Sequence, residues 1–231
     1  MNFRFFLVLL YSFVVLTVGI PLMFIFRRKM HLLRKIWAYS TIWLLGVEIE
    51  VSGEIDTDAD VLVLNHNSML DAMLLEKLCG DEIVWVVKDT LSKIPIFGLI
   101  LKLPQFILID SSKRSSLKKF LVEAKKMQGK GRTLAIFPEG KHGQTDNFYQ
   151  FHKGIKIVAE KLNLKVQPVV LVNTKNILNI EKRSAHAGKA KIFYLDTFSD
   201  LSDTKWFSEM EDHMKHLYCQ EKKKSEKDAL Q

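Results

Sequence analysis

The residues best suited to chemistry lie in two polar turns, and each turn follows a short apolar run. The first turn is Asn65-His66-Asn67-Ser68-Met69-Leu70-Asp71, which comes directly after residues 61–64. On a regular helix five residues advance by about 500°, which would keep His66 and Asp71 on different faces. We therefore expect His66 to precede a helix that holds Asp71 in its first two turns. The Asp71 carboxylate can then bond to one ring nitrogen of His66 and leave the other nitrogen as a base.

The same turn also has a purely structural interpretation. Asn65 and His66 can cap the helix that follows, and Asp71 then favours the positive end of the helix dipole. The pair has no nucleophile of its own, so as a catalyst it needs a substrate that brings the attacking group. The turn alone leaves both interpretations open.

The second turn, Phe137-Pro138-Glu139-Gly140-Lys141-His142, follows another apolar run. Glu139 can accept hydrogen bonds from substrate hydroxyls or orient a neighbour, and Gly140 permits a close approach of the backbone. Lys141 and His142 can face a phosphate. The alternative is a tight turn whose charges are solvated. Open α/β sheets place their ligand sites beyond the carboxyl ends of the strands, where these turns are expected.

Short β-rich runs alternate with helix-like stretches after residue 47, which is typical of an α/β domain. The predicted strands are 47–54, 61–64, 83–88, 106–110, 133–137, 166–172 and 191–195. The predicted helices are 115–128, 151–162 and 203–224, the last of them amphipathic and expected to cover the sheet. The predicted fold class is α/β, with a mixed central sheet flanked by helices in one domain over 47–231.

The N-terminal part predicts a membrane anchor. An uncharged apolar run, 5–26, is long enough to cross about 30 Å of hydrocarbon. A cleaved signal peptide is the competing interpretation, but no A-x-A-like site follows and the run ends in three basic residues, 27–29. Together with Arg34 and Lys35, these residues place the following chain on the cytoplasmic side if the run spans a membrane.

A second apolar stretch, 36–47, contains Trp37, Tyr39 and Trp43, aromatic types that favour the membrane interface. It is either a second membrane helix or a buried helix of the domain. Two anchoring modes follow: one helix spans the bilayer, or two helices enter a single leaflet with the basic link 27–35 on the headgroups. In both cases the predicted anchor is 1–46.

Charge and cysteine content narrow the class of protein only partly. Lysine and arginine number 34 against 26 acidic residues, a net charge of +8 over 231 residues. Such a chain favours nucleic acid, anionic lipid or an acidic partner, and charge alone does not choose among them. Cys79 and Cys219 lie far apart without metal-ligand spacing, so no disulfide framework or CxxC zinc site is indicated.

Together the two turns resemble the hallmarks of the glycerolipid acyltransferase family typified by 1-acylglycerol-3-phosphate acyltransferases. Asn65-His66 to Asp71 matches the family's N-H-x4-D block, and Phe137-Pro138-Glu139-Gly140 matches its F-P-E-G block. Two weaker blocks are similar as well, at 88–98 and at 151–154 followed by 166–169. The resemblance covers roughly residues 60–172.

The resemblance implies acyl transfer, without a metal, to the sn-2 hydroxyl of 1-acylglycerol-3-phosphate, giving phosphatidate in phospholipid biosynthesis. His66 would take the hydroxyl proton as the acceptor oxygen attacks a thioester, and Asp71 would fix the imidazole. The implied substrate-binding residues are Asn65, Lys88, Arg114, Phe137, Pro138, Glu139, Gly140, Lys141 and His142.

No cofactor is implied, because the acyl group arrives on a co-substrate, acyl-CoA or acyl carrier protein. The implied partners are the membrane lipid bilayer, a lysophospholipid acceptor and that donor, with no nucleic acid. The implied location is a membrane, with the catalytic domain on its cytoplasmic face. Acyl-chain length would depend on the depth of a groove, for which Phe97, Phe106 and 99–103 are candidate walls.

Two departures from the family pattern bear on the acceptor. The family commonly continues F-P-E-G with Thr-Arg, whereas this chain has Lys141-His142. The Ile-Asp-Arg of the third block is Ile109-Asp110-Ser111 here, with Lys113 and Arg114 nearby. Arginine binds phosphate as a bidentate fork and lysine as a point charge, so the same reaction on another lysophospholipid or on a lyso-aminolipid stays open.

Two rivals belong to other classes of protein. One is a membrane-bound metal-dependent hydrolase that uses His66, Asp71 and Glu139, although the sequence has no HExxH-type ligand set. The other is a non-catalytic lipid-binding protein that keeps the fold, in which His66 would be dispensable.

Overall fold

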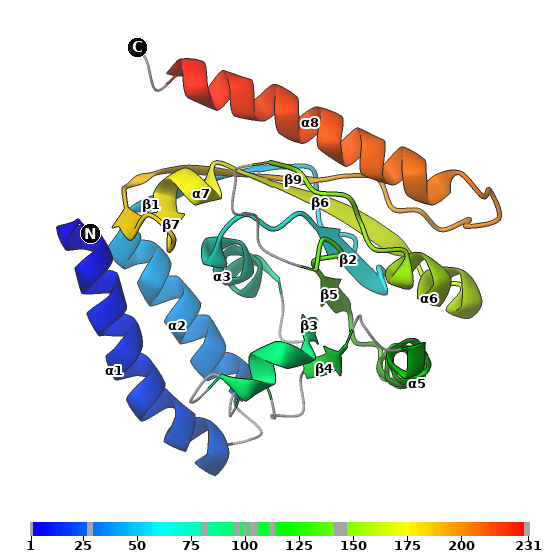
Figure 1. The fold of residues 1–231 in the computed structure, drawn as a ribbon, viewed down its shortest axis with the longest axis horizontal. Coiled ribbons are helices and arrows are strands. Elements are labelled where there is room, and N and C mark those ends of the chain that lie inside the picture. Colours follow the sequence, from blue (N-terminus) through cyan, green and yellow to red (C-terminus); the bar gives the residue numbers. More distant parts are fainter. Residues whose placement is uncertain are drawn as a thin grey trace.

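A seven-stranded mixed sheet lies at the centre of the chain, with helices on both faces (Figure 1). The computed structural model describes residues 2–26, 30–79, 83–94, 98, 101, 106–110, 114–140 and 147–228. Within these residues the sheet strands are β1 (Val47–Ser52), β2 (Val61–Leu64), β3 (Val84–Lys88), β4 (Phe106–Ile109), β5 (Leu134–Ile136), β6 (Val166–Val172) and β9 (Gly188–Tyr194). A small separate hairpin pairs β7 (Leu178–Asn179) with β8 (Ser184–Ala185).

The spatial order of the strands is β1-β9-β6-β2-β5-β3-β4. Strands β6, β2, β5, β3 and β4 run parallel to one another, so their carboxyl ends share one edge. Strand β9 is antiparallel to β6, and β1 is parallel to β9. The mixed α/β sheet predicted from the sequence is confirmed, and each of the seven predicted runs forms a strand.

The described helices are α1 (Phe3–Ile25), α2 (Met30–Leu45), α3 (Met69–Leu78), α5 (Arg114–Gln128), α6 (Gly154–Leu162), α7 (Thr174–Ile177), α8 (Trp206–Asp228) and the 3₁₀ helix η2 (Asp89–Lys93). The three predicted helices correspond to α5, α6 and α8. Helix α6 begins three residues later than predicted because the backbone N–H of His152 bonds to the Pro138 carbonyl at 2.9 Å. The segment before α6 is thereby held to the second polar turn.

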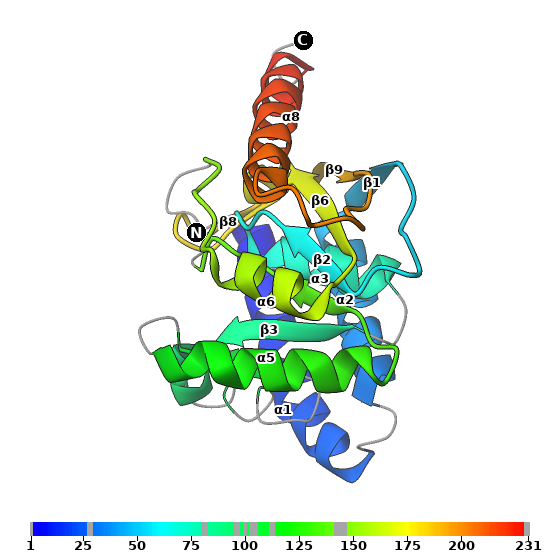
Figure 2. The ribbon, with the colours of Figure 1, turned by 90° about the vertical axis from the view of Figure 1, so that its right-hand side faces the viewer.

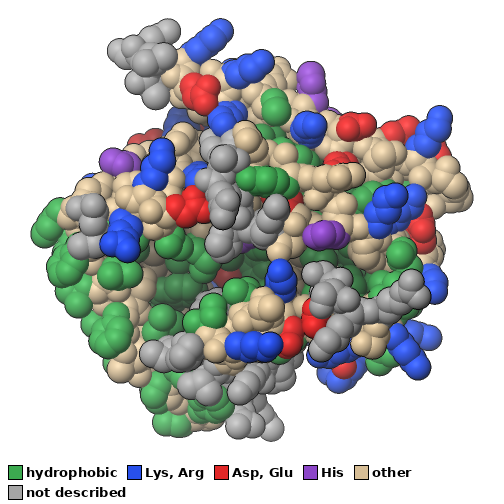
Figure 3. Space-filling view, in the orientation of Figure 1, with side chains coloured by type: hydrophobic (Ala, Val, Ile, Leu, Met, Phe, Trp, Pro, Cys, Tyr) green, Lys and Arg blue, Asp and Glu red, His purple; other side chains and the backbone are tan. Residues whose placement is uncertain are grey.

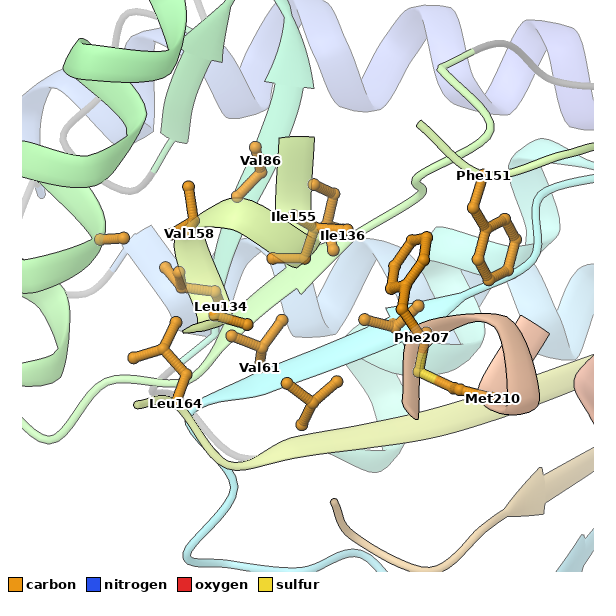
Figure 4. Close-up of a cluster of buried hydrophobic side chains, with 14 of the residues drawn as sticks. Val61, Val86, Leu134, Ile136, Phe151, Ile155, Val158, Leu164, Phe207 and Met210 are labelled. Carbon is orange, nitrogen blue, oxygen red and sulfur yellow. The ribbon is translucent and has the colours of Figure 1, made fainter. Parts of the chain in front are cut away.

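The strands alternate their side chains between two cores. Val61 and Val63 of β2 face a cluster shared with α5, α6 and α8, part of which Figure 4 shows around Ile136 and Ile155. Leu62 and Leu64 face a second cluster, shared with α1, α2, α3 and α7. Figure 2 shows α5 and α6 in front of the sheet. Because both faces are covered, the parallel strands are almost continuously apolar.

The N-terminal helices pack onto the domain. Asn2 caps α1 by accepting a hydrogen bond from the N–H of Phe5 at 3.0 Å, and its amide also donates to the Ala185 carbonyl of β8 at 2.8 Å. Arg4 donates to the Leu45 carbonyl at the end of α2. Helix α1 is long and apolar enough to cross a membrane. Its exposed apolar residues are Phe3, Phe6, Leu9, Leu10, Phe13, Val14, Val18, Phe24 and Ile25.

Helix α2 combines both interpretations of the stretch 36–47. Ala38, Ile42 and Leu45 are buried in the second core cluster, whereas Tyr39 is exposed and Trp43 is 82 % exposed. One side of this helix therefore belongs to the domain core and the other side presents aromatic rings. The anchor boundary predicted at 46 falls between α2 and β1 and stays a prediction. The basic residues 27–29 lie outside the described residues.

The buried Gln167 of β6 generates a stability prediction. Its side chain accepts a hydrogen bond from the Asp56 N–H at 3.0 Å and donates to the carbonyls of Glu54 and Leu195. Gln167→Leu keeps the volume but leaves three part-buried backbone groups without this partner. We expect a loss of about 3 kcal/mol in stability, measured as a lower melting temperature in detergent.

The exposed Gln220→Leu on α8 is the matched control for that substitution. It should leave the melting temperature unchanged. A Gln167→Leu protein as stable as the control would show that the three hydrogen bonds contribute no net stability.

Candidate active site

Both polar turns lie at the carboxyl edge of the parallel strands, as predicted. His66 follows β2, Phe137 follows the neighbouring β5, and Lys88 ends β3 on the far side of β5. Parallel pairing brings these three strand ends together although they lie far apart in the sequence.

His66 and Asp71 are in direct contact. The Nδ1 atom of His66 lies 3.0 Å from Oδ2 of Asp71, and the Asp71 side chain is fully buried. His66 precedes α3 and Asp71 lies in the first turn of that helix, so the predicted geometry is confirmed. When Nδ1 carries the proton shared with Asp71, the lone pair needed by a base is on Nε2.

The capping interpretation of this turn is correct for Asp71, which lies in the first turn of α3, but wrong for Asn65 and His66, because neither of them caps the helix. Ser68 is the N-cap of α3, and its hydroxyl accepts a hydrogen bond from the N–H of Leu70. Asp71 Oδ2 also accepts hydrogen bonds from the backbone N–H groups of Asn67 at 2.7 Å and Ser68 at 2.8 Å. The Asp71 carboxylate therefore takes part in capping the N-terminus of α3 and also orients the His66 ring.

Aromatic stacking fixes the plane of the imidazole. The Phe137 ring lies 3.9 Å from the His66 ring at an interplanar angle of 13°, and Trp85 stacks on Phe137 at 5.4 Å. The Trp85 indole donates to Glu76 at 2.6 Å, and Glu76 also pairs with Arg34 of α2 at 3.4 Å. Phe137, predicted to bind substrate, thus directly supports the histidine.

Glu139 lies behind the histidine and is buried. Its Oε1 accepts a hydrogen bond from the backbone N–H of His66 at 3.1 Å, so it fixes the His66 main chain. Burial raises the pKa of Glu139 to about 8, and the nearby Asp71 charge adds to this effect, while the hydrogen bond from His66 opposes it. The carboxyl is therefore mostly neutral at pH 7.

Asn65 has a different role from the predicted substrate contact. It is fully buried, its amide donates to the Leu171 carbonyl at 2.8 Å, and its carbonyl oxygen accepts from the Leu171 N–H at 2.8 Å. Asn65 therefore ties the turn to β6. Glu139 takes the second of its two predicted roles, because its Oε1 orients the neighbouring His66 main chain, and its contact with substrate stays a prediction.

An apolar cavity, which we call cavity 1, opens beside His66 and has a volume of about 590 Å³. It extends between α1, α2, α3 and β3, and its walls include Gly19, Ile20, Met73, Trp85, Leu101 and Phe106. Of the candidate groove walls, Phe106 and Leu101 line this cavity, whereas Phe97, 99–100 and 102–103 lie outside the described residues. The contribution of α1 could not be seen in the sequence.

A second cavity, cavity 2, has a volume of about 350 Å³ and adjoins the first. Val86, Val87, Lys88, Phe137 and Gly140 line both. Pro138, His152, Lys153 and the first half of α5 complete its wall. Gly140 has a φ of +66°, a conformation that L side chains rarely adopt, so a side chain at this position would strain the turn that lines both cavities.

The remaining predicted site residues are only partly placed. Lys88 is exposed at the end of β3, and Pro138 reaches cavity 2. Lys141 and His142 lie outside the described residues, as does the side chain of Arg114. The sequence interpretation missed His152 and Lys153, although the 151–154 block had been noticed, and it gave Arg34 only a membrane-flanking role. Arg34 is buried beside Glu76 and lines cavity 1.

Fold and site together define an O-acyltransferase: a histidine held by a buried carboxylate stands at the edge of an α/β sheet, beside an apolar cavity. The acyltransferase family matches residues 48–172, more than half of the chain. The chain belongs to this family, so the enzyme class predicted from the sequence is confirmed.

Named relatives and a solved structure agree with this assignment. A 1-acyl-sn-glycerol-3-phosphate acyltransferase from Helicobacter pylori is 36 % identical over 76 % of this chain and 75 % of that protein. Proteins of the same name from Cocos nucifera and Borreliella burgdorferi are 30 % and 29 % identical, and the matched regions cover 55 % and 56 % of their lengths.

The crystal structure of a 1-acyl-sn-glycerophosphate acyltransferase from Thermotoga maritima has a TM-score of 0.75 and 18 % identity, with 96 % of both chains covered. At this identity the match shows the fold. It extends over the N-terminal helices as well as the sheet.

The buried Glu139 carboxyl predicts a pH dependence of stability. Its pKa in the folded protein, about 8, lies above the usual 4.5, so between these values the unfolded chain loses the proton first. Stability therefore falls as pH rises through this window. Glu139→Gln keeps the acceptor for the His66 N–H and does not titrate, so its melting temperature should exceed that of wild type by a margin that grows from pH 5 to pH 8.

Two further variants complete that test. Glu139→Ala removes the acceptor and should lose activity at pH 7, whereas Glu139→Gln should stay within about threefold of wild type. The exposed Glu209→Gln is the control for removal of a carboxylate. A melting-temperature margin that does not widen with pH would contradict a neutral buried Glu139.

Proposed function

We propose that this enzyme transfers an acyl chain from a thioester to the sn-2 hydroxyl of 1-acylglycerol-3-phosphate and so forms phosphatidate. The observation that carries the proposal is the His66–Asp71 pair, whose histidine lines an apolar cavity together with the exposed cation Lys88. The names of the relatives from three organisms support the choice of acceptor.

The proposed reaction needs no acyl-enzyme. Nε2 of His66 takes the proton of the acceptor hydroxyl while that oxygen forms a bond to the thioester carbonyl carbon. The carbon–sulfur bond then breaks, and the proton passes from His66 to the leaving thiolate. Asp71 stabilises the imidazolium that exists between these steps, and its three hydrogen bonds fix its position next to the ring.

Cavity 1 is the proposed site of an acyl chain. Its walls are mostly apolar, they come from α1, α2, α3 and the sheet, and His66 is one of the residues that line it. A chain within it places a carbonyl carbon beside the base. Lys88 and the turn at Gly140, which lines both cavities, are the proposed contacts of the glycerol phosphate, with Lys141 and His142 following in the sequence.

Association with a membrane is the proposed role of the exposed side of α1 and α2. Apolar residues cover α1, and the aromatic rings of Tyr39 and Trp43 project from α2. We place both helices in a single leaflet, because α1 also forms a wall of cavity 1 and is fixed to the domain through Asn2 and Arg4. The catalytic domain then lies on the cytoplasmic face, as the basic link predicts.

The base and the acceptor are tested together. We expect the protein reconstituted in lipid to move a labelled acyl group from a thioester to 1-acylglycerol-3-phosphate. His66→Ala should lower the rate by about 10³, since general base catalysis contributes up to about 10⁴. Asp71→Asn should lower it by at least about 10² through loss of the charge that stabilises the imidazolium. The exposed His216→Ala is the control and should retain full activity.

The acceptor panel includes other lysophospholipids and a lyso-aminolipid, and one arm contains a chelator. Transfer only to another lysolipid would overturn the glycerol phosphate acceptor. Loss of activity with the chelator would support a metal-dependent reaction instead. An unchanged rate in His66→Ala would remove the proposed base.

A further inference from the structure

The outward side of α5 carries a row of lysines that the proposed chemistry does not use. Lys118, Lys119, Val122, Lys125 and Lys126 are all exposed, and we call them the lysine stripe. Their spacings of three, four and seven residues put them on one side of a helix about 22 Å long.

The residues of the lysine stripe do not take part in packing α5 onto the domain. Phe120, Ala124 and Met127, on the opposite side of the helix, are buried in the core cluster shared with α6 and α8. Residues 114–132 contain seven basic residues and one acidic residue, and so hold most of the net charge of +8. That acidic residue, Glu123, lies 3.8 Å from Lys126 in an exposed pair, which contributes little.

Val122 lies among these lysines and is 59 % exposed. An apolar side chain surrounded by charges of one sign is the arrangement of a small protein-docking surface, in which charge steers the encounter and the apolar centre gives contact. The partner that fits this surface is acidic.

The lysine stripe lies across the sheet from the apolar side of α1. Helix α5 packs in one core cluster, and α1 and α2 pack in the other. Figure 1 shows α1 and α5 at opposite sides of the molecule, and Figure 2 shows α5 in front with α1 behind. In Figure 3 hydrophobic side chains cover the side of α1. The lysine stripe and the apolar surface of α1 therefore lie on different sides of the sheet.

Cavity 2 lies between α5 and the turn that follows β5. Ser116, Leu117 and Phe120 of α5 line it, and it shares Lys88 and Gly140 with cavity 1, which His66 lines. The two cavities are therefore neighbours on the α5 side of the site.

We propose that the lysine stripe is the docking site of an acidic acyl carrier protein, whose thioester arm enters through cavity 2. The inference rests on the proposed function and names its donor. Coenzyme A has few phosphates and needs cations at one or two points, whereas four lysines spread along a helix match an extended acidic surface. A small, charged interface also suits a donor that must leave after each turnover.

The test reverses two charges of the stripe. Lys118→Glu combined with Lys125→Glu, in the full chain in phosphatidylcholine nanodiscs, is assayed with acyl carrier protein and acyl-CoA donors of equal chain length. With the carrier protein we expect kcat/KM to fall about tenfold or more, mainly through KM, and to depend less on salt. With acyl-CoA we expect kcat/KM within about twofold of wild type.

Two matched control variants distinguish the effect of where the charges lie from the effect of the net charge of the protein. Lys223→Glu with Lys227→Glu makes the same charge change on the exposed side of α8, and Lys118→Arg with Lys125→Arg keeps the charge of the stripe. Both should behave as wild type. Fluorescence anisotropy of a labelled carrier protein with the nanodiscs measures docking independently of turnover, and binding should weaken only in the stripe reversal.

Three results would overturn the docking site: an equal loss with both donors, unchanged carrier-protein binding and kinetics, or a stripe reversal that weakens only binding to vesicles of anionic lipid. In each case, transfer from acyl-CoA by the wild type would still support the proposed function. No transfer from either donor, with carrier-protein binding intact and sensitive to the stripe, would overturn the function and retain the surface.

Discussion

The site depends on one buried carboxylate. Asp71 Oδ2 accepts hydrogen bonds from Asn67 and Ser68 and contacts the ring of His66, so a single oxygen atom has three partners. A buried charge without partners would be strongly unfavourable, and the two backbone donors make the charge tolerable before any histidine is considered. The start of α3 therefore creates the conditions in which an ionised acid can stand next to the imidazole.

Hydrogen bonds from neighbouring strands fix the backbone of the turn between β2 and α3. The Asn65 side chain bonds to the backbone of β6, and Glu139, in the turn after β5, accepts a hydrogen bond from the backbone of His66. Phe137 stacks on the ring itself. Asn65 and Glu139 therefore fix the backbone of the turn, and Phe137 fixes the ring of His66. This arrangement is what positions a base to within the small tolerances that proton transfer needs.

The sequence was sufficient to predict those features of the structure that depend on local periodicity. The strands follow from continuous apolar runs, and the His66–Asp71 contact follows from the rise and twist of a helix. It was insufficient where residue type allows several partners. The resemblance implied that Asn65 and Glu139 contact substrate, and the structure gives them Leu171 and His66 as partners, which only the packing of β6 and β5 brings near. The α1 wall of cavity 1 could not be predicted either, because α1 reaches the cavity from more than 40 residues upstream of His66.

The sheet separates two surfaces that match the two substrates we propose. Its α1 and α2 side is apolar and contains cavity 1, while its α5 side is basic and lies beside cavity 2. The proposed acyl chain suits the first side, and the proposed anionic carrier suits the second. The carboxyl edge of β2, β5 and β3 adjoins both cavities, since Lys88, Phe137 and Gly140 line both. A base for the proposed transfer from a thioester to a lipid hydroxyl therefore belongs at that edge, where β2 ends and His66 begins the turn.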